Sequence, residues 1–247
     1  YLERVQKEER MLMRKLSDGA ILGISLIISA FIFGLFFYNS RAPEKTIRTV
    51  GAATESISSD IIKWRVTIAR NADQNGLKEA YKLIAEDLAA FKKVLTEQGI
   101  DTKEMGVQPV MTNQNYNSQG AVTGYNITQN FYLISKEMKK VEDLALNPGI
   151  FTDRGLMVQY SNLEYYNSQL DQVKRNLLAK ATLDAKRRAA EIAKGTGDKI
   201  GKIQSARVGV FQITEPYSTE VSDYGVHNTS TKDKEITVTV HVVFGMK

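Results

Sequence analysis

The side chains that most often carry chemistry are scarce in this sequence. Histidine occurs only at His227, in a polar stretch, and at His241, on the face of the last predicted strand opposite its apolar residues. Cysteine is absent. Imidazoles and thiolates are the usual protein ligands of zinc and related metals. Because no His-x-x-x-His or Glu-x-x-His spacing occurs, we expect no metal site and interpret both histidines as surface or interface side chains.

Serine, glycine and carboxylate patterns do not predict a catalytic site either. No Gly-x-Ser-x-Gly elbow occurs, and a Ser-His-Asp arrangement would need one of the two histidines. The glycine-rich run 195–198 follows a predicted helix, whereas a phosphate-binding loop precedes one. The paired carboxylates at 86–87 and 142–143 lie on predicted helix faces, where a solvated charge is the common case. We therefore predict no catalytic residues, no cofactor and no enzyme.

Two polar stretches are best suited to binding, the turn region of a predicted β-hairpin and a long connection. Residues 112–124 and 213–234 are rich in Asn, Gln, Ser and Thr, and they carry Tyr116, Tyr217 and Tyr224. A connection of more than about twenty residues in a compact domain is usually functional or disordered. Tyrosine combines an apolar ring with a hydroxyl, which suits protein contacts. These are candidate partner or interface loops, with a surface loop that has no partner as the alternative.

The first predicted element of the chain is a membrane span, which sets the side of the membrane on which these loops lie. Residues 20–38 contain no charged side chain, in a sequence of which 25% is charged. A helix of this length covers about 28 Å, close to the ~30 Å hydrocarbon core of a bilayer. We therefore predict a transmembrane anchor in contact with lipid rather than the core helix of a soluble protein. Residues of this anchor include Ile21, Leu26, Phe31, Phe36 and Tyr38.

Small residues recur four positions apart within the predicted span. They are Gly23, Ser25, Ser29, Ala30 and Gly34. Such spacing lets two helices approach closely, so these residues are candidates for helix–helix contacts. Because small residues are common in spans, plain exposure to lipid stays open as the alternative.

Charge and processing signals favour an uncleaved anchor with its N-terminus inside. Five Lys and Arg residues precede the span within 1–19, and three follow it, at Arg41, Lys45 and Arg48. A cleaved signal peptide fits less well, because the apolar run exceeds the usual length of about 7–15 residues. We predict a cytoplasmic segment over 1–19, a linker over 39–45 and an extracytoplasmic domain over 46–247. The net charge is only +5, and the Lys and Arg residues are not clustered in a basic stripe, which argues against nucleic acid as a partner.

Apolar periodicity beyond the span predicts an α+β domain in the order ββαββαβαββ. We expect strands over 46–56, 62–69, 104–111, 125–133, 156–165, 203–212 and 235–244. Two long helices are expected, over 77–98 and from a capping box at Ser168-x-x-Asp171 to Gly195, with a short helix over 137–147. This order predicts helices packed on a mainly antiparallel sheet rather than a doubly wound parallel fold.

Several segments of this domain resemble the SIMPL-domain proteins of bacteria. They are SSDIIKWRVTI, LTEQGIDTKEMGVQPV, VTGYNITQNFYLI and KRNLLAKATLDAKRRAAEIAKGTGDKIGKI, which follow the family's order. The resemblance runs from Thr46 to the end of the sequence. It implies an α+β envelope domain outside the cytoplasmic membrane, no known catalytic residues and a tendency toward ring-like homo-oligomers. Many members are secreted through a cleaved signal, whereas this sequence predicts a retained anchor.

Together these features predict a single-pass protein of the bacterial cytoplasmic membrane, with its main domain periplasmic or extracellular. The first hypothesis is ring- or cage-like homo-oligomeric assembly, with a role in envelope or oxidative stress that the resemblance implies. The alternative is a binding module whose tyrosine-bearing loops capture an envelope protein or a small ligand. An enzyme is the third and least favoured class.

Overall fold

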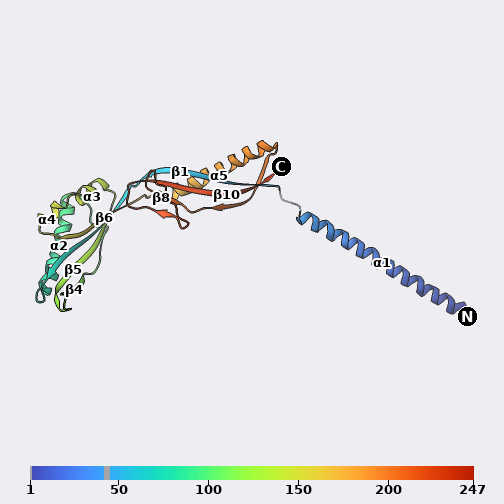
Figure 1. Ribbon diagram of the computed structural model, residues 1–247, viewed down its shortest axis with the longest axis horizontal. Helices are drawn as coiled ribbons and strands as arrows, with labels where there is room; N and C mark the ends of the chain where they lie inside the picture. The colour runs from blue at the N-terminus through green and yellow to red at the C-terminus, as the bar shows by residue number, and fades with distance from the viewer. Residues whose placement is uncertain (1, 42–44) are drawn as a thin grey trace. The chain divides into compact units, whose positions relative to one another are not determined.

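The computed structural model describes residues 2–41 and 45–247 (Figure 1). It divides into an N-terminal helical unit and a folded domain that begins at Ile47. The domain contains helices and two sheets in which nearly all described strand pairs are antiparallel, so the predicted α+β class is confirmed.

Helix α1, Leu2–Arg41, contains the predicted span. The segment Gly19–Tyr38 is long and apolar enough to cross a membrane, and none of it is buried. Such a helix is consistent with a single-pass anchor or a signal peptide. The predicted linker over 39–45 differs from the structure, because the helix continues to Arg41; residues 42–44 lie outside the described residues.

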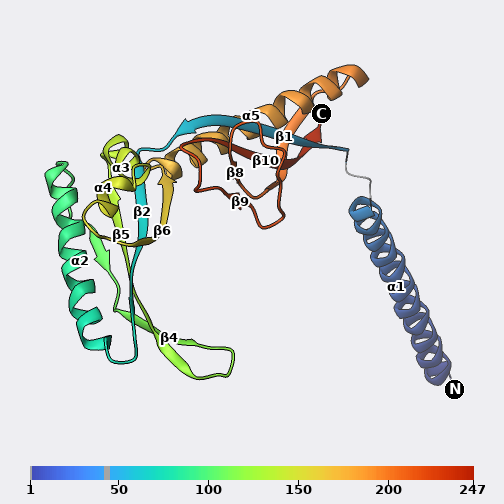
Figure 2. The same ribbon diagram turned by 60° about the vertical axis from the view of Figure 1, so that its left-hand side comes forward.

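The first sheet contains the strand that follows the anchor and the last strand of the chain. Its strands are β1 (Thr46–Ser58), β7 (Ile200–Val208), β8 (Gln212–Thr214), β9 (Val226–His227) and β10 (Asp233–Met246). They are ordered β1-β10-β8-β9, and β7 also pairs with β10. The short β8–β9 pair is parallel. Helix α5 (Leu170–Thr196) runs along this sheet (Figure 2).

Helix α5 packs unusually close to β1 because its inward face is made of small residues. These are Ala181, Ala185, Ala189 and Ala193, at four-residue spacing, and all are buried. The Thr49 hydroxyl donates a hydrogen bond to the Ala185 carbonyl at 3.1 Å. The backbone N–H of Ala52 donates to the Asp184 carboxylate at 2.9 Å. That hydrogen bond is the main reason why the pKa of Asp184 is lowered, followed by the bond from Arg188.

The second sheet holds the main aromatic core. Its strands are β2 (Ile61–Ala72), β3 (Met105–Val107), β4 (Met111–Tyr116), β5 (Val122–Ser135) and β6 (Val158–Tyr166), ordered β3-β5-β2-β6 with β4 paired to β5. Helices α2 (Leu77–Glu97), α3 (Met138–Ala145) and α4 (Gly149–Thr152) cover one face (Figure 2). The rings of Trp64, Phe131 and Phe151 surround Phe91 at centroid distances of 4.6–5.4 Å.

A corner at Ser59 and Asp60 joins the two sheets. The Ser59 N–H donates to the Lys232 carbonyl at 2.9 Å, and the Asp60 N–H donates to Tyr166 at 3.0 Å. Ser168, just before α5, donates both its N–H and its hydroxyl to the Asp60 carboxylate. The hydroxyl bond is the largest cause of the lowered pKa of Asp60. The predicted capping box is therefore wrong: the α5 cap is Gln169, and Ser168 binds Asp60 instead.

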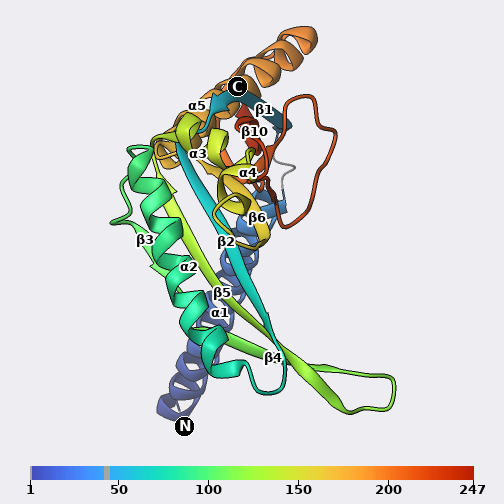
Figure 3. The ribbon, with the colours of Figure 1, turned by 90° about the vertical axis from the view of Figure 1, so that its left-hand side faces the viewer.

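Two further expectations are corrected by the strand pairing. The predicted single sheet is two sheets, because β1 and β2 pair with different partners on either side of the corner. The stretch 112–124, expected to be the polar turn region of a hairpin, consists mostly of β4 and the start of β5, and the turn itself is confined to 117–121 (Figure 3). Its side chains are largely exposed on both faces, so the apolar alternation that marks a half-buried strand is missing.

Among the described glycines, Gly51 has the least room for a side chain. A Cβ there would lie 2.1 Å from the Ala181 carbonyl oxygen and 2.3 Å from the Ala185 nitrogen, both backbone atoms of α5. We expect Gly51→Ala to lower the free energy of unfolding by about 2 kcal/mol or more, because α5 must move outward. Urea unfolding of the full chain in mild detergent measures this change.

The matched control is Gly195→Ala, at a glycine in the last turn of α5 where an added Cβ meets nothing within 4 Å. It should leave stability unchanged or raise it by up to about 1 kcal/mol. Equal stability of the two variants would contradict the close packing of α5 on β1.

Candidate functional site

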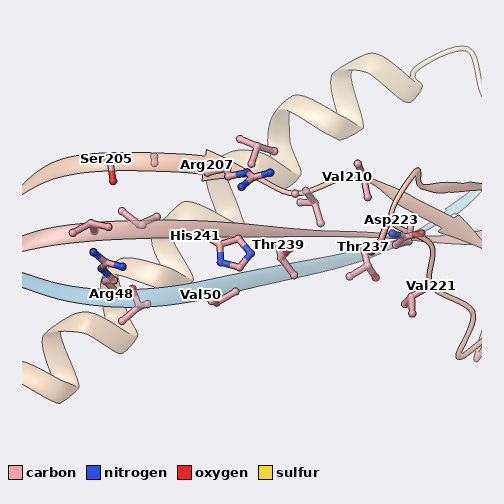
Figure 4. A pocket seen from close by; sticks show the side chains of 18 of the residues that line it. Arg48, Val50, Ser205, Arg207, Val210, Val221, Asp223, Thr237, Thr239 and His241 are labelled. Atoms are coloured by element: carbon pink, nitrogen blue, oxygen red, sulfur yellow. The ribbon is translucent and has the colours of Figure 1, made fainter.

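A groove of about 960 Å³ lies on the first sheet, between β1, β10, β7 and the loop that leads to β9 (Figure 4). Strand β1 contributes Arg48 and Val50, and β7 contributes Ser205 and Arg207. The central strand β10 contributes a row of alternate residues along its length, and the loop contributes the wall near Asp223. The row on β10 consists of Thr237, Thr239, His241 and Val243.

Strand alternation explains why these side chains share one face. On β10 the predicted apolar row is confirmed as buried: Ile236, Val238, Val240, Val242 and Phe244. The intervening residues therefore point to the opposite face. On β1, Thr49 and Gly51 contact α5, so Arg48 and Val50 face away from the helix. The hydroxyls of Thr54 and Thr237 lie 2.8 Å apart, which aligns β1 with β10 along this face.

The groove carries more positive than negative charge, and its cations are unpaired. Arg48 and Arg207 make no ion pair or side-chain hydrogen bond within the described part of the chain, and both are exposed. His241 lies between the strands that carry them (Figure 4). Asp223 is the groove's only carboxylate among the described lining residues. The arrangement can bind a negatively charged group without breaking an existing ion pair.

The loop between β8 and β9 is held by the side chain of Gln212. Its amide nitrogen donates to the Ser222 carbonyl at 2.7 Å, and its amide oxygen accepts from the Val226 N–H at 2.9 Å. The rings of Tyr217 and Tyr224 are left 95% and 97% exposed on this loop. The predicted connection 213–234 is therefore not a single loop: it includes parts of β8 and β10 and the whole of β9, and the two tyrosines lie on the loop between β8 and β9, whose residues Val221 and Asp223 line the groove.

The structure does not bring the third predicted tyrosine to this loop. Tyr116 lies at the end of β4 in the hairpin of the second sheet, 60% exposed, with its hydroxyl bonded to Gln114 (Figure 3). The groove residues Arg48, Arg207 and Asp223 were missed by the sequence analysis. An alternation count along β1 would have placed Arg48 opposite the buried face, but no local signal marks Arg207 or Asp223.

The predicted anchor residues all lie on the apolar part of α1. Ile21, Leu26, Phe31, Phe36 and Tyr38 are exposed, as a lipid-facing surface requires. The small residues Gly23, Ser25, Ser29, Ala30 and Gly34 are exposed as well. The Ser25 hydroxyl donates to the Ile21 carbonyl at 2.7 Å within the helix. Contacts between copies of this helix stay a prediction.

Two of the paired carboxylates in the sequence have structural partners. Asp87, expected to be solvated, is buried and receives two hydrogen bonds of 2.6 Å from Arg70. Glu142 accepts a hydrogen bond from the Tyr165 hydroxyl; burial first and this bond second raise the pKa of Tyr165 to about 12. Over the described residues, no group of three or more His, Asp or Glu side chains could hold a metal ion.

His227 lies on β9 next to two lysines. Burial is the main cause of its lowered pKa, followed by the positive charges of Lys174 and Lys234. Lys234 is itself buried, which lowers its pKa, and its ammonium donates to the Thr231 carbonyl. Lys174 lies over the Phe211 ring, 5.5 Å from the centroid.

The family model of the SIMPL domain, described as a protein of unknown function (DUF541), matches residues 47–244. The chain belongs to the SIMPL family. A search of the curated proteins found no match. The matched range includes both sheets almost entirely and every residue of the groove, so the groove lies within the SIMPL domain of this chain.

Replacing Lys174 should change the titration of His227 in the SIMPL domain. The folded-state pKa of His227 lies below the ordinary 6.5, so the unfolded chain binds the proton more readily. Its contribution to stability is therefore complete above about pH 6.5 and is lost as pH falls through the folded-state pKa. Lys174→Gln should raise the pKa of His227 and reduce this acid destabilisation. The raise is partial, because burial is unchanged.

Titration of the imidazole C–H signals by NMR measures this shift. Lys186→Gln, on exposed α5 surface, is the control and should leave the His227 titration where it is. An unchanged pKa in Lys174→Gln would contradict the coupling between Lys174 and His227.

Proposed function

We propose that this chain is a membrane-anchored SIMPL protein whose domain binds another protein outside the cytoplasm. The observation that carries the proposal is the pair Tyr217 and Tyr224, nearly fully exposed on a loop that Gln212 holds beside the groove. Exposed aromatic rings on a water-surrounded surface favour burial against a partner. The anchor at Gly19–Tyr38 supports a location at the bacterial cytoplasmic membrane.

Preorganisation makes this loop better suited to binding than a flexible one. Ordering a loop on association costs free energy, and that cost falls when the loop is already held in place. Asn228 adds to the support, because its side chain donates to Glu215 at 2.8 Å and accepts from the Ser230 N–H at 2.9 Å. Tyrosine has few rotatable bonds, so little side-chain freedom is lost on contact.

The five Lys and Arg residues before the span, against three after it, support a cytoplasmic N-terminus and a periplasmic or extracellular SIMPL domain. A role in envelope or oxidative stress follows from the family resemblance alone and stays a prediction.

Homo-oligomeric assembly is the second candidate, and the edge strand β7 favours it. Within the described residues, β7 pairs only with β10, so its other edge has unpaired backbone groups. Ile203 and Val208 on this strand are each 50% exposed. An uncovered edge strand is a template for pairing with another chain. If the contact joined unlike surfaces of successive copies and the rotation between copies closed, it would form a ring; otherwise it would form an open filament.

Site-specific photo-crosslinking in living cells tests the binding proposal. A photoreactive phenylalanine analogue placed at Tyr224 in the full-length chain should crosslink to one discrete protein whose mass differs from that of this chain. The same analogue at Lys186, on α5, is the control and should not crosslink to that protein.

The identity of the crosslinked chain separates the two candidates. A discrete adduct with another protein supports the binding module, and mass spectrometry of the adduct identifies it. An adduct made only of two copies of this chain favours assembly. Absence of any adduct specific to Tyr224 would overturn the binding proposal at this loop.

A further inference from the structure

The groove is elongated along the strands that form its floor. The β10 residues that line it run from Thr237 to Val243, and the alternate positions Thr237, Thr239, His241 and Val243 share the strand face that forms the floor. At about 3.3 Å per residue, this row is roughly 20 Å long. A space of about 960 Å³ with this length fits an extended chain of about six residues better than a compact ligand. The shape therefore favours a polypeptide segment in extended conformation.

Charge in the groove is divided along its length. Arg48 and Arg207 flank His241, whereas Asp223 lies beside Thr237 at the other end (Figure 4). A guanidinium presents a planar pair of N–H donors that matches a carboxylate, so the two arginines can each bind one carboxylate oxygen pair. Asp223 repels the same group. Carboxylates of a bound segment are therefore favoured at the arginine end.

Apolar side chains complete the walls between the charged groups. Val50 and Val210 are 43% and 44% exposed, and Val221 on the loop is 78% exposed. Along an extended segment, successive side chains point to opposite sides, so one set can face the groove while the other faces solvent. Apolar stems of the inward side chains would contact these valines, and their carboxylates would reach the arginines.

We infer that the groove binds an extended acidic segment of a partner protein, with carboxylates held by Arg48 and Arg207. This inference rests on the proposed binding function, and it adds the chemistry of the ligand. Nothing in the groove has to be displaced except water, because neither arginine has an ion-pair partner among the described residues. The same geometry predicts that Asp223 opposes the acidic ligand rather than helping it.

The test uses full-length protein in detergent and fluorescently labelled decapeptides, with binding followed by fluorescence anisotropy. The probe alternates Glu and Thr, and its neutral counterpart alternates Gln and Thr. We expect the Glu-Thr peptide to bind at least about tenfold more tightly than the Gln-Thr peptide. The advantage should shrink as salt is raised, because the contacts are charged and close to solvent.

Three variants assign the binding to the groove. The double change Arg48→Gln and Arg207→Gln should lower the affinity for the Glu-Thr peptide at least about tenfold and leave the affinity for the Gln-Thr peptide unchanged. Arg187→Gln removes the same kind of charge from exposed α5 surface and should have no effect. Asp223→Asn should increase the affinity for the Glu-Thr peptide, because a repelling carboxylate is removed. A misfolded variant could not produce this opposite sign.

Several results would overturn the inference. The first is equal affinity for the two peptides. The second is an equal loss of affinity for the Glu-Thr peptide in Arg187→Gln and in the double arginine variant. The third is weaker binding of the Glu-Thr peptide to Asp223→Asn. Inorganic polyphosphate is included as a competitor. If it bound tightly while the Glu-Thr peptide did not, the groove would be a site for phosphate polymers rather than for an acidic protein segment.

Crosslinking from Tyr224 keeps the two proposals apart. If the partner adduct persists in the double arginine variant while the peptides show no charge preference, the binding function stands and the acidic-segment inference fails. If peptide binding follows the prediction but no Tyr224 adduct forms, the groove binds without the loop and the proposed role of the tyrosines fails.

Discussion

The close contact between α5 and β1 is the packing on which the first sheet depends. The helix approaches β1 so closely that Gly51 has no room for a Cβ, and this is compatible only with the alanine face of α5. Because α5 covers one face of β1 and β10, the apolar row of β10 is removed from water, at roughly 25 cal/mol per Å² of buried apolar surface. The opposite face, with Arg48 and His241, is left free to form the groove.

The corner at Ser59 and Asp60 connects that packing to the rest of the SIMPL domain. Its backbone groups bind Lys232, just before β10 of the first sheet, and Tyr166 of the second sheet, while the Asp60 carboxylate receives both hydrogen bonds from Ser168 just before α5. Consecutive strands β1 and β2 thus enter different sheets. The hydrogen bonds of Ser59 and Asp60 therefore connect both sheets and the segment that begins α5.

The arginines of the two sheets have different surroundings, and this difference supports a role in recognition. In the second sheet, Arg65 pairs with Glu164 at 2.7 Å and Arg70 pairs with Asp87 at 2.6 Å. In the groove, Arg48 and Arg207 have no ion-pair partner in the described part of the chain and stay hydrated at little cost. Paired arginines stabilise the fold, whereas unpaired ones on one elongated surface are available to an acidic ligand.

The sequence by itself determined the apolar helix over Gly19–Tyr38, the α+β class, most helix and strand positions, and the family, because these follow from local periodicity and ordered motifs. It did not show that 112–124 forms paired strands, since exposed amide-rich strands lack alternation. Only the tertiary structure decided that the strands divide into two sheets and that Arg48, Arg207 and Asp223 border one groove. These residues are distant in sequence, and strand pairing alone brings them together.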